Sequence, residues 1–206
     1  MKLLIAVPAM DTVPVPFLNS LLGLQARLIR DGVEHEIRIE SGTLVYMARD
    51  RLASKAINEG FSHVLWLDSD MVFHSGIFED LQWSGKSFVS GIAHGRRSPF
   101  PSCVFKDISL EHLQRWELEE YPTTTFEVAG CGFACVLIET EILKAVMLQW
   151  GTCFTPRKQY GEDLIFCLRA ANLGYKIYAE PTVRLGHIGH IEIWPDDCER
   201  YRDVIH

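Results

Sequence analysis

The sequence predicts an α/β fold in which a mostly parallel, open sheet is flanked by helices within one compact domain. Over residues 2–68, apolar runs typical of buried strands alternate with segments of helical periodicity. The order strand, helix, strand, helix, strand favours right-handed crossovers and therefore a parallel sheet. The length of 206 residues suits a single domain with a sizeable core, and no repeat or linker divides the chain.

The first half of the chain carries the more regular pattern. We predict strands over 2–7, 35–39 and 63–67, and helices over 14–30 and 43–58. Thr43 is a candidate N-cap of the second helix, and Gly32 and Gly60 follow the two helix ends, where glycine is favoured.

The second half is less regular, and its elements are shorter. We predict strands over 86–93, 102–106, 124–129, 134–139 and 176–179, and helices over 140–149 and 162–172. The acidic segment 110–120 is a further helix candidate on a solvated excursion. The chain is expected to divide in function at about residue 100, with donor binding in residues 1–100 and acceptor binding and catalysis in residues 101–206.

Composition and charge exclude several function classes. The formal net charge of −7 argues against a dedicated nucleic-acid binder. None of the six cysteines forms a Cys-x-x-Cys pair, so we expect buried thiols of a cytoplasmic protein, in the host cytoplasm if the gene is a phage gene, and no zinc site. The apolar start is too short for a signal peptide, and no run approaches the ~20 apolar residues that cross a bilayer.

The string Asp68-Ser69-Asp70 follows the third predicted strand. Ligands of parallel α/β sheets bind at the carboxyl ends of strands, and two carboxylates there can share a divalent cation. A simple turn explains the same string equally well, because aspartate is common in turns. Its meaning depends on partners elsewhere in the chain.

Two later segments supply such partners. Glu162 and Asp163 begin a predicted helix, although acids also stabilise helix N-termini without any catalytic role. His187 lies between glycines in a predicted loop, with His190 as its substitute, and either imidazole is a possible ligand of Mn²⁺. Carboxylates, a cation and a separate base are what transfer from a nucleotide sugar requires, because the cation offsets charge on the departing diphosphate and the base deprotonates the acceptor.

Six motifs, in this order, resemble those of GT-A fold glycosyltransferases. They are Val7-Pro8, Ala48-Arg49-Asp50, Leu65-Trp66-Leu67-Asp68-Ser69-Asp70, Gly130-Cys131-Gly132-Phe133, Gly161-Glu162-Asp163 and His187-Ile188-Gly189. The chain is most similar to bacterial and phage relatives of the large inverting family that includes cellulose synthases. Position 50 departs from the pattern, because the family element reads Ala-Arg-Asn.

The resemblance implies a role for each matched position. Asp70 and His187 would bind Mn²⁺ or Mg²⁺, and Asp68 would reach the ribose or the metal through water. Asp163 would be the general base, and Glu162 would help to bind the acceptor. The remaining implied contacts are to the nucleotide and its phosphates from Pro8, Ala9, Met10, Arg49 and Ser69, and to the donor-sugar and acceptor side from Gly130, Cys131, Gly132 and Phe133.

Other arginines and the substrates are less defined. Arg96 and Arg97 form either a surface turn or a contact to the diphosphate or to an anionic acceptor. The resemblance implies a nucleotide-diphosphate sugar donor, with UDP favoured by family habit, and inversion at the sugar carbon. The acceptor hydroxyl could belong to a glycan, a lipid-linked sugar, a protein or a modified nucleic-acid base.

Two other functions are compatible with the same elements. A sugar-phosphate nucleotidyltransferase would share the sheet and the acids, but the loop from Pro8 to Asp11 lacks the glycine and basic residues that hold a triphosphate. A non-catalytic binder of glycans or nucleotide sugars would keep the fold without needing all the acids.

Overall fold

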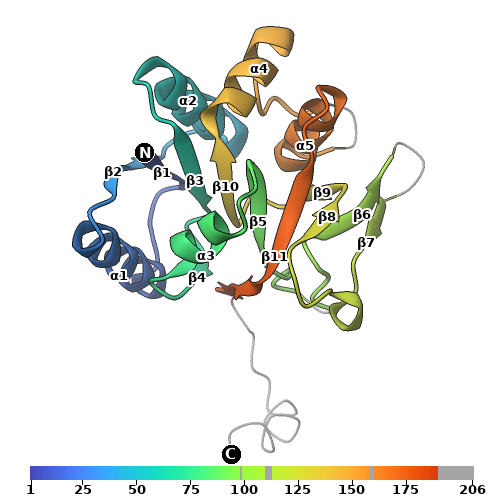
Figure 1. Ribbon diagram of the computed structural model, residues 1–206, viewed down its shortest axis with the longest axis horizontal. Coiled ribbons are helices and arrows are strands. Elements are labelled where there is room, and N and C mark those ends of the chain that lie inside the picture. Colours follow the sequence, from blue (N-terminus) through green and yellow to red (C-terminus); the bar gives the residue numbers. More distant parts are fainter. Residues whose placement is uncertain (98, 110–112, 158–159, 190–206) are drawn as a thin grey trace, which may run out of the picture.

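A seven-stranded sheet forms the centre of the computed structural model (Figure 1), which describes residues 1–97, 99–109, 113–157 and 160–189. In spatial order its strands are β2 (Glu34–Glu40), β1 (Lys2–Pro8), β3 (His63–Leu67), β10 (Cys135–Glu139), β5 (Phe88–Ile92), β11 (Ile177–Arg184) and β8 (Phe126–Val128). Strands β10 and β8 run antiparallel to their neighbours, and the others share one direction. The predicted α/β fold with a mainly parallel sheet is confirmed.

Helices cover both faces of this sheet (Figure 1). The side chains of β1 point alternately to the two faces, and those on each face are apolar and need a cover. Leu3, Ile5 and Val7 pack in one core with α1 (Val15–Arg30) and α3 (Ile77–Trp83). Leu4 and Ala6 face the other core, which contains residues of α2 (Val45–Asn58), α4 (Thr140–Trp150) and α5 (Glu162–Asn172). Because successive strand residues point to opposite faces, a strand apolar throughout must be buried on both sides.

Two small sheets form in addition to the central sheet. One pairs β4 (Met71–Val72) with β12 (Gly186–His187), and the other joins β7 (Leu113–Arg115), β6 (Val104–Ile108) and β9 (Gly130–Cys131). A short 3-10 helix, η1 (Leu118–Glu120), follows β7. Among the described residues, no helix is long and apolar enough to span a bilayer.

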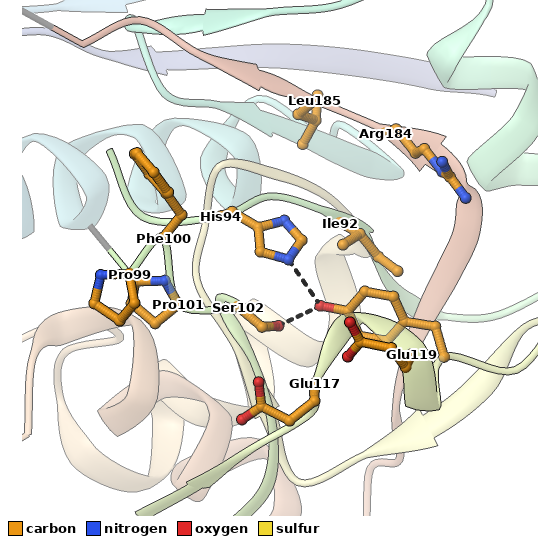
Figure 2. A pocket seen from close by; sticks show the side chains of 11 residues that line it. Ile92, His94, Pro99, Phe100, Pro101, Ser102, Glu117, Glu119, Arg184 and Leu185 are labelled. Atoms are coloured by element: carbon orange, nitrogen blue, oxygen red, sulfur yellow. Dashed lines mark hydrogen bonds between the residues drawn. The ribbon is translucent and has the colours of Figure 1, made fainter. Parts of the chain in front are cut away.

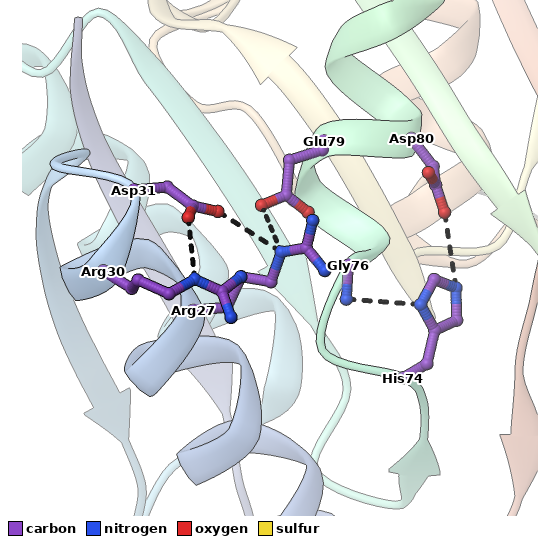
Figure 3. Close-up of polar contacts among 7 residues, drawn as sticks. All are labelled: Arg27, Arg30, Asp31, His74, Gly76, Glu79 and Asp80. Carbon is purple, nitrogen blue, oxygen red and sulfur yellow. Dashed lines mark hydrogen bonds and ion pairs between the residues drawn. The ribbon is translucent and has the colours of Figure 1, made fainter.

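Polar contacts join α1 to α3 at the outer side of the molecule (Figure 3). Arg27 Nε lies 2.9 Å from Glu79 Oε1 and 3.3 Å from Asp31 Oδ2. Beside them, His74 Nε2 lies 3.4 Å from Asp80 Oδ2. Because these groups are solvated, their pairing contributes little to stability, and the apolar faces of the helices dominate the packing.

Several predicted elements differ from the structure. The helix candidate over 110–120 is wrong, because residues 113–115 pair with β6 and only 118–120 turn helically. Thr43 is not the N-cap of α2; Leu44 holds that position without a side-chain cap. Helix α3 and strands β4 and β12 were not predicted, because two-residue strands and a seven-residue helix carry too little periodicity.

The described cysteines Cys103, Cys131, Cys135, Cys153 and Cys167 are free thiols, as predicted, whereas Cys198 lies outside the described residues. Burial raises the pKa of the Cys153 thiol to about 12. A thiol held in this state does not ionise near neutral pH and behaves as a small apolar group.

Candidate active site

A cavity of about 460 Å³ lies at the carboxyl ends of β1 and β3, where the sheet topology places ligands. All six residues predicted for nucleotide binding line it: Pro8, Ala9, Met10, Arg49, Asp68 and Ser69. Asp70, Arg96 and Glu162 also line this cavity, so these nine residues come from five separate parts of the sequence. We call it the donor cavity below.

His187 reaches Asp70 because β12 pairs with β4, the two-residue strand directly after Asp70. The N–H of Ile188 donates to the Asp70 carbonyl at 2.8 Å, which fixes the register. As a result, His187 Nε2 lies 3.1 Å from Asp70 Oδ2. The sequence-predicted pair of metal ligands is therefore adjacent although 117 residues separate its members.

A backbone carbonyl orients the His187 ring. His187 Nδ1 lies 2.8 Å from the carbonyl oxygen of His94, an acceptor only, so Nδ1 must carry the proton that is donated. In the neutral imidazole, the lone pair of Nε2 then faces a carboxylate oxygen. Two acceptors at 3.1 Å need a cation or a proton between them, and metal-bound histidines commonly use such a second hydrogen bond.

The donor set therefore fits a divalent cation. A carboxylate and an imidazole with the correct tautomer suit Mn²⁺, and substrate phosphates and water usually complete such a coordination sphere. Within the described part of the chain, no group of three or more His, Cys, Asp or Glu side chains forms a closed metal cage. Two candidate ligands would leave coordination positions open for a substrate.

Arg96 and Arg97 differ in position. Arg96 Nη1 lies 2.8 Å from Asp70 Oδ2, the same oxygen that His187 faces, and the Arg96 side chain is half exposed. Arg97 is exposed, and its carbonyl accepts a hydrogen bond from the N–H of Phe100. Arg96 thus belongs to the donor cavity, whereas Arg97 belongs to the adjoining turn. His190 lies outside the described residues.

Arg49 is a buried cation among acids. Its Nη2 lies 2.6 Å from Asp68 Oδ1, and its Nη1 lies 3.5 Å from Glu162 Oε1. Burial lowers the pKa of Arg49, but the negative charges of Asp68, Glu162 and Asp163 more than offset that effect, so its pKa is raised. The guanidinium also lies over the ring of Phe133, 5.0 Å from its centroid, which fixes its plane.

Asp163 is the second residue of α5, directly after Glu162, and it does not itself line the donor cavity. Burial raises the pKa of Asp163, the charge of Arg49 lowers it, and Glu162 raises it again, so the net shift is upward. A carboxylate with a raised pKa is a stronger base than a solvated one. A Cβ added at Gly161 would lie 3.1 Å from Asp163 Oδ1, so glycine leaves this carboxylate its space.

The predicted segment 130–133 is mostly core. Gly130, Cys131 and Phe133 are buried, and Phe133 packs edge-to-face against Phe154 and Phe166. Gly132 is the member nearest to Asp163, because a Cβ there would lie 3.7 Å from Asp163 Oδ2. The segment therefore borders the site through Gly132 and supports Arg49 through Phe133.

Asp50 has a role that the sequence did not reveal. Its Oδ1 accepts hydrogen bonds from the N–H groups of Cys153 at 2.8 Å and Phe154 at 2.9 Å, and the Thr152 hydroxyl donates to Oδ2 at 2.5 Å. Asp50 thus ties α2 to the loop before α5. Its position next to Arg49 links that loop to the donor cavity.

Sequence reasoning also missed His94 and several cavity residues. The further lining residues are Thr12, Pro14, Thr43, Val45 and Ile188. His94 acts through its carbonyl, and backbone acceptors leave no residue-type signal. The available signal was its position just past the predicted strand 86–93, at the same sheet edge as Asp68.

Comparisons with known proteins support the fold. No family model and no curated protein matches the sequence. Among solved structures, A197 from STIV aligns with a TM-score of 0.62 at 20% identity, over 92% of this chain and 87% of that one. The catalytic domain of Drosophila beta1,4galactosyltransferase 7, in complex with xylobiose, aligns with a TM-score of 0.58 at 14% identity, over 98% and 79%.

A third solved structure, GalNAc-T7 with UDP, GalNAc and Mn²⁺, aligns with a TM-score of 0.54 at 11% identity. The match covers 94% of this chain but 45% of the other, so this chain corresponds to less than half of it. At these identities the likeness shows the fold alone. The chain has the GT-A-like fold of glycosyltransferase catalytic domains.

Proposed function

We propose that the chain is a metal-dependent glycosyltransferase that moves a sugar from a nucleotide-diphosphate sugar to an acceptor hydroxyl, with inversion. The observation that carries this proposal is the pairing of Asp70 with His187 at the rim of the donor cavity, with the His187 tautomer set by His94. Either a proton or a bound cation can lie between these two acceptors, and the proposal assigns the position to a cation. The fold shared with glycosyltransferases supports the proposal.

Each group then has a task. Asp70 and His187 hold Mn²⁺ or Mg²⁺, which when bound offsets the charge on the departing diphosphate. The residues of β1 and its loop form the nucleotide pocket, and we favour UDP, the nucleotide that GalNAc-T7 holds together with Mn²⁺. Asp68, held by Arg49, faces the same cavity and suits a contact to the ribose.

Asp163 is the general base in this proposal. It takes the proton from the acceptor hydroxyl as that oxygen attacks the sugar carbon, and inversion requires base and leaving group on opposite faces of the ring. Its burial and its nearness to Glu162 keep it basic, while Arg49 limits the accumulated negative charge. Glu162 lines the donor cavity and contributes to substrate binding.

Release of UDP from a panel of UDP-sugars, measured with and without Mn²⁺, tests the proposal. Slow transfer to water should give metal-dependent UDP release from at least one donor, and Asp163→Asn should abolish release while UDP still binds. Pyrophosphate release from UTP and a sugar 1-phosphate would instead identify a nucleotidyltransferase. Binding of a UDP-sugar without any turnover, even with added glycosides, would identify a non-catalytic binder.

A further inference from the structure

A second cavity of about 630 Å³ (Figure 2) is lined partly by chain neighbours of residues that line the donor cavity. The same two chain segments contribute to both. In the first segment, Ile92 and His94 line the second cavity and Arg96 lines the donor cavity. In the second segment, Leu185 lines the second cavity and Ile188 lines the donor cavity. His187, between the last two, is held by the carbonyl of His94. The wall between the cavities thus contains the proposed metal ligand.

Asp163, the proposed base, does not line the second cavity, but it lies near the chain neighbour of one lining residue. Ser102 lines the cavity, and the next residue, Cys103, packs near Asp163: a Cβ added at Gly132 would lie 3.3 Å from Cys103 Cβ and 3.7 Å from Asp163 Oδ2. A molecule in this cavity therefore lies between the segment of the metal ligand and the segment of the base. An acceptor must approach both groups.

The lining combines flat apolar surfaces with fixed hydrogen-bonding groups. His94 and Ser102 both contact the hydroxyl of Tyr121, and dashed lines in Figure 2 mark these contacts. The Tyr121 hydroxyl donates to Ser102 Oγ at 2.5 Å and lies 3.4 Å from His94 Nε2. Phe100 lines the cavity with 58% of its surface exposed.

Phe100 is held in an unusual backbone conformation. Its φ of 56° is the one positive value at a non-glycine residue in the described part of the chain. A left-handed conformation at a bulky residue is strained, and such strained residues are concentrated at functional and ligand-binding positions. The N–H of Phe100 donates to the Arg97 carbonyl at 2.7 Å, which holds the turn that presents the ring.

Charge decides between the possible acceptors. Glu117 and Glu119 line the cavity, opposed by Arg184 alone among permanently charged residues, so the lining has no surplus of positive charge. A polyanion such as a nucleic acid needs clustered cations. Aromatic faces with carboxylates and hydroxyls suit instead a neutral polyol, whose C–H faces stack and whose hydroxyls donate to carboxylates.

We infer that this cavity binds the acceptor and that the acceptor is a neutral saccharide. The inference rests on the proposed function, because it assigns the cavity to the second substrate of the same reaction. Phe100 supplies the stacking surface, Glu117 accepts hydrogen bonds from sugar hydroxyls, and the Tyr121–Ser102–His94 contacts form the polar floor. Among the four acceptor classes predicted from the sequence, the lining favours a glycan over a nucleic-acid base.

The test uses isothermal titration of the whole chain with xylobiose, cellobiose and lactose in the presence of UDP and Mn²⁺. At least one disaccharide should bind at millimolar concentration. Phe100→Ala should weaken that binding about 3- to 10-fold, the size expected for one lost aromatic contact, and Glu117→Gln should weaken it too. Trp83→Ala, which removes a ring that is 93% exposed on α3, is the matched control and should bind as the wild type does.

UDP–Mn²⁺ binding in the same samples distinguishes failure of the acceptor assignment from failure of the proposed function. If UDP binds and no disaccharide does, or if Phe100→Ala and Glu117→Gln bind disaccharide as tightly as the wild type, the acceptor assignment is overturned and the proposed function stands. Competition of an oligothymidylate with the disaccharide would also overturn it. If the wild type binds no UDP with Mn²⁺, the proposed function fails, and with it the assignment of this cavity to an acceptor.

Discussion

At the scale of single residues, Arg49 organises the charge of the site. It is the one buried cation that faces Asp68, Glu162 and Asp163 in the described structure. Three acids around one guanidinium leave a negative surplus, which is costly in a buried position unless a further cation joins it. The arrangement therefore depends on Arg49 for folding.

Removal of Arg49 should destabilise the protein strongly. Arg49→Ala leaves three partly buried carboxylates uncompensated, and because they keep some contact with water the cost should not exceed the ~3–5 kcal/mol typical of a fully buried charge. Arg49→Lys keeps the charge but loses the planar contact to Phe133 and should cost less. Urea denaturation measures both, with Arg51→Ala as the control, since Arg51 is exposed and pairs only with Glu40 at the surface. Equal midpoints for Arg49→Ala and Arg51→Ala would contradict the role of Arg49.

Asp163 should show the opposite effect on stability. The pKa of Asp163 is raised in the folded protein. The ionised carboxylate therefore destabilises the native state relative to the unfolded state at pH values above the ordinary pKa of aspartate. Asp163→Asn should therefore raise the melting temperature at pH 7. As the pH falls, Asp163 becomes protonated and no longer destabilises the native wild type. The difference in melting temperature between Asp163→Asn and the wild type should therefore shrink toward pH 4. A lower melting temperature for Asp163→Asn at pH 7 would contradict this account.

The same shift predicts the pH dependence of turnover. The base must be ionised, so kcat should fall as the pH falls through the raised pKa of Asp163, at a higher pH than for an unperturbed aspartate. A pH–rate profile of UDP release measures this limb. Rates that stay level down to the ordinary pKa of aspartate would show that Asp163 is solvated or is not the base.

At the scale of elements, the loop before α5 depends on Asp50. Three hydrogen bonds from residues 152–154 converge on its carboxylate, and Phe154 packs against Trp66 in the core. Position 50 is aspartate here and asparagine in the family that the sequence resembles. Both side chains carry an oxygen that can accept hydrogen bonds from this loop. An amide oxygen can also receive the two backbone N–H groups.

Substitution at position 50 should separate these contributions. Asp50→Ala removes every acceptor and should cost about 3 kcal/mol, because hydrogen bonds to charged groups contribute ~1.5–3 kcal/mol each and water replaces some of them. Asp50→Asn keeps Oδ1 and should cost about 1 kcal/mol or less. Thermal denaturation of the two variants measures the difference. Equal destabilisation would show that the charge, rather than the acceptor geometry, holds the loop.

The first-half elements were predictable because each carries a long pattern. The apolar strands β1 and β3 and the helices α1 and α2 lie within a residue or two of their predicted bounds. The antiparallel insertion of β10 between β3 and β5 was not predictable, since strand order depends on packing far along the chain. The short pair β4 and β12 decides where His187 lies, yet two residues per strand give no periodic signal.

At the scale of the whole molecule, the site depends on contacts between distant segments. Asp70 and His187 are 117 residues apart, and Arg49 and Glu162 come from two helices on the same face. Residue types and motif order predicted which side chains matter. The sequence could not predict that His94 would hold His187 by a backbone carbonyl or that Arg96 would share the Asp70 oxygen, because both follow from the fold of a turn.

The central claim is that Asp70 and His187 form a cation site that holds a nucleotide diphosphate, and titration of UDP with and without Mn²⁺ tests it most directly. Wild-type protein should bind UDP far more tightly with Mn²⁺, and Asp70→Asn and His187→Ala should lose most of that gain while they fold normally. His74→Ala is the matched control, because this histidine pairs with Asp80 away from the donor cavity. A metal-dependent affinity that persists in both Asp70→Asn and His187→Ala would contradict the claim.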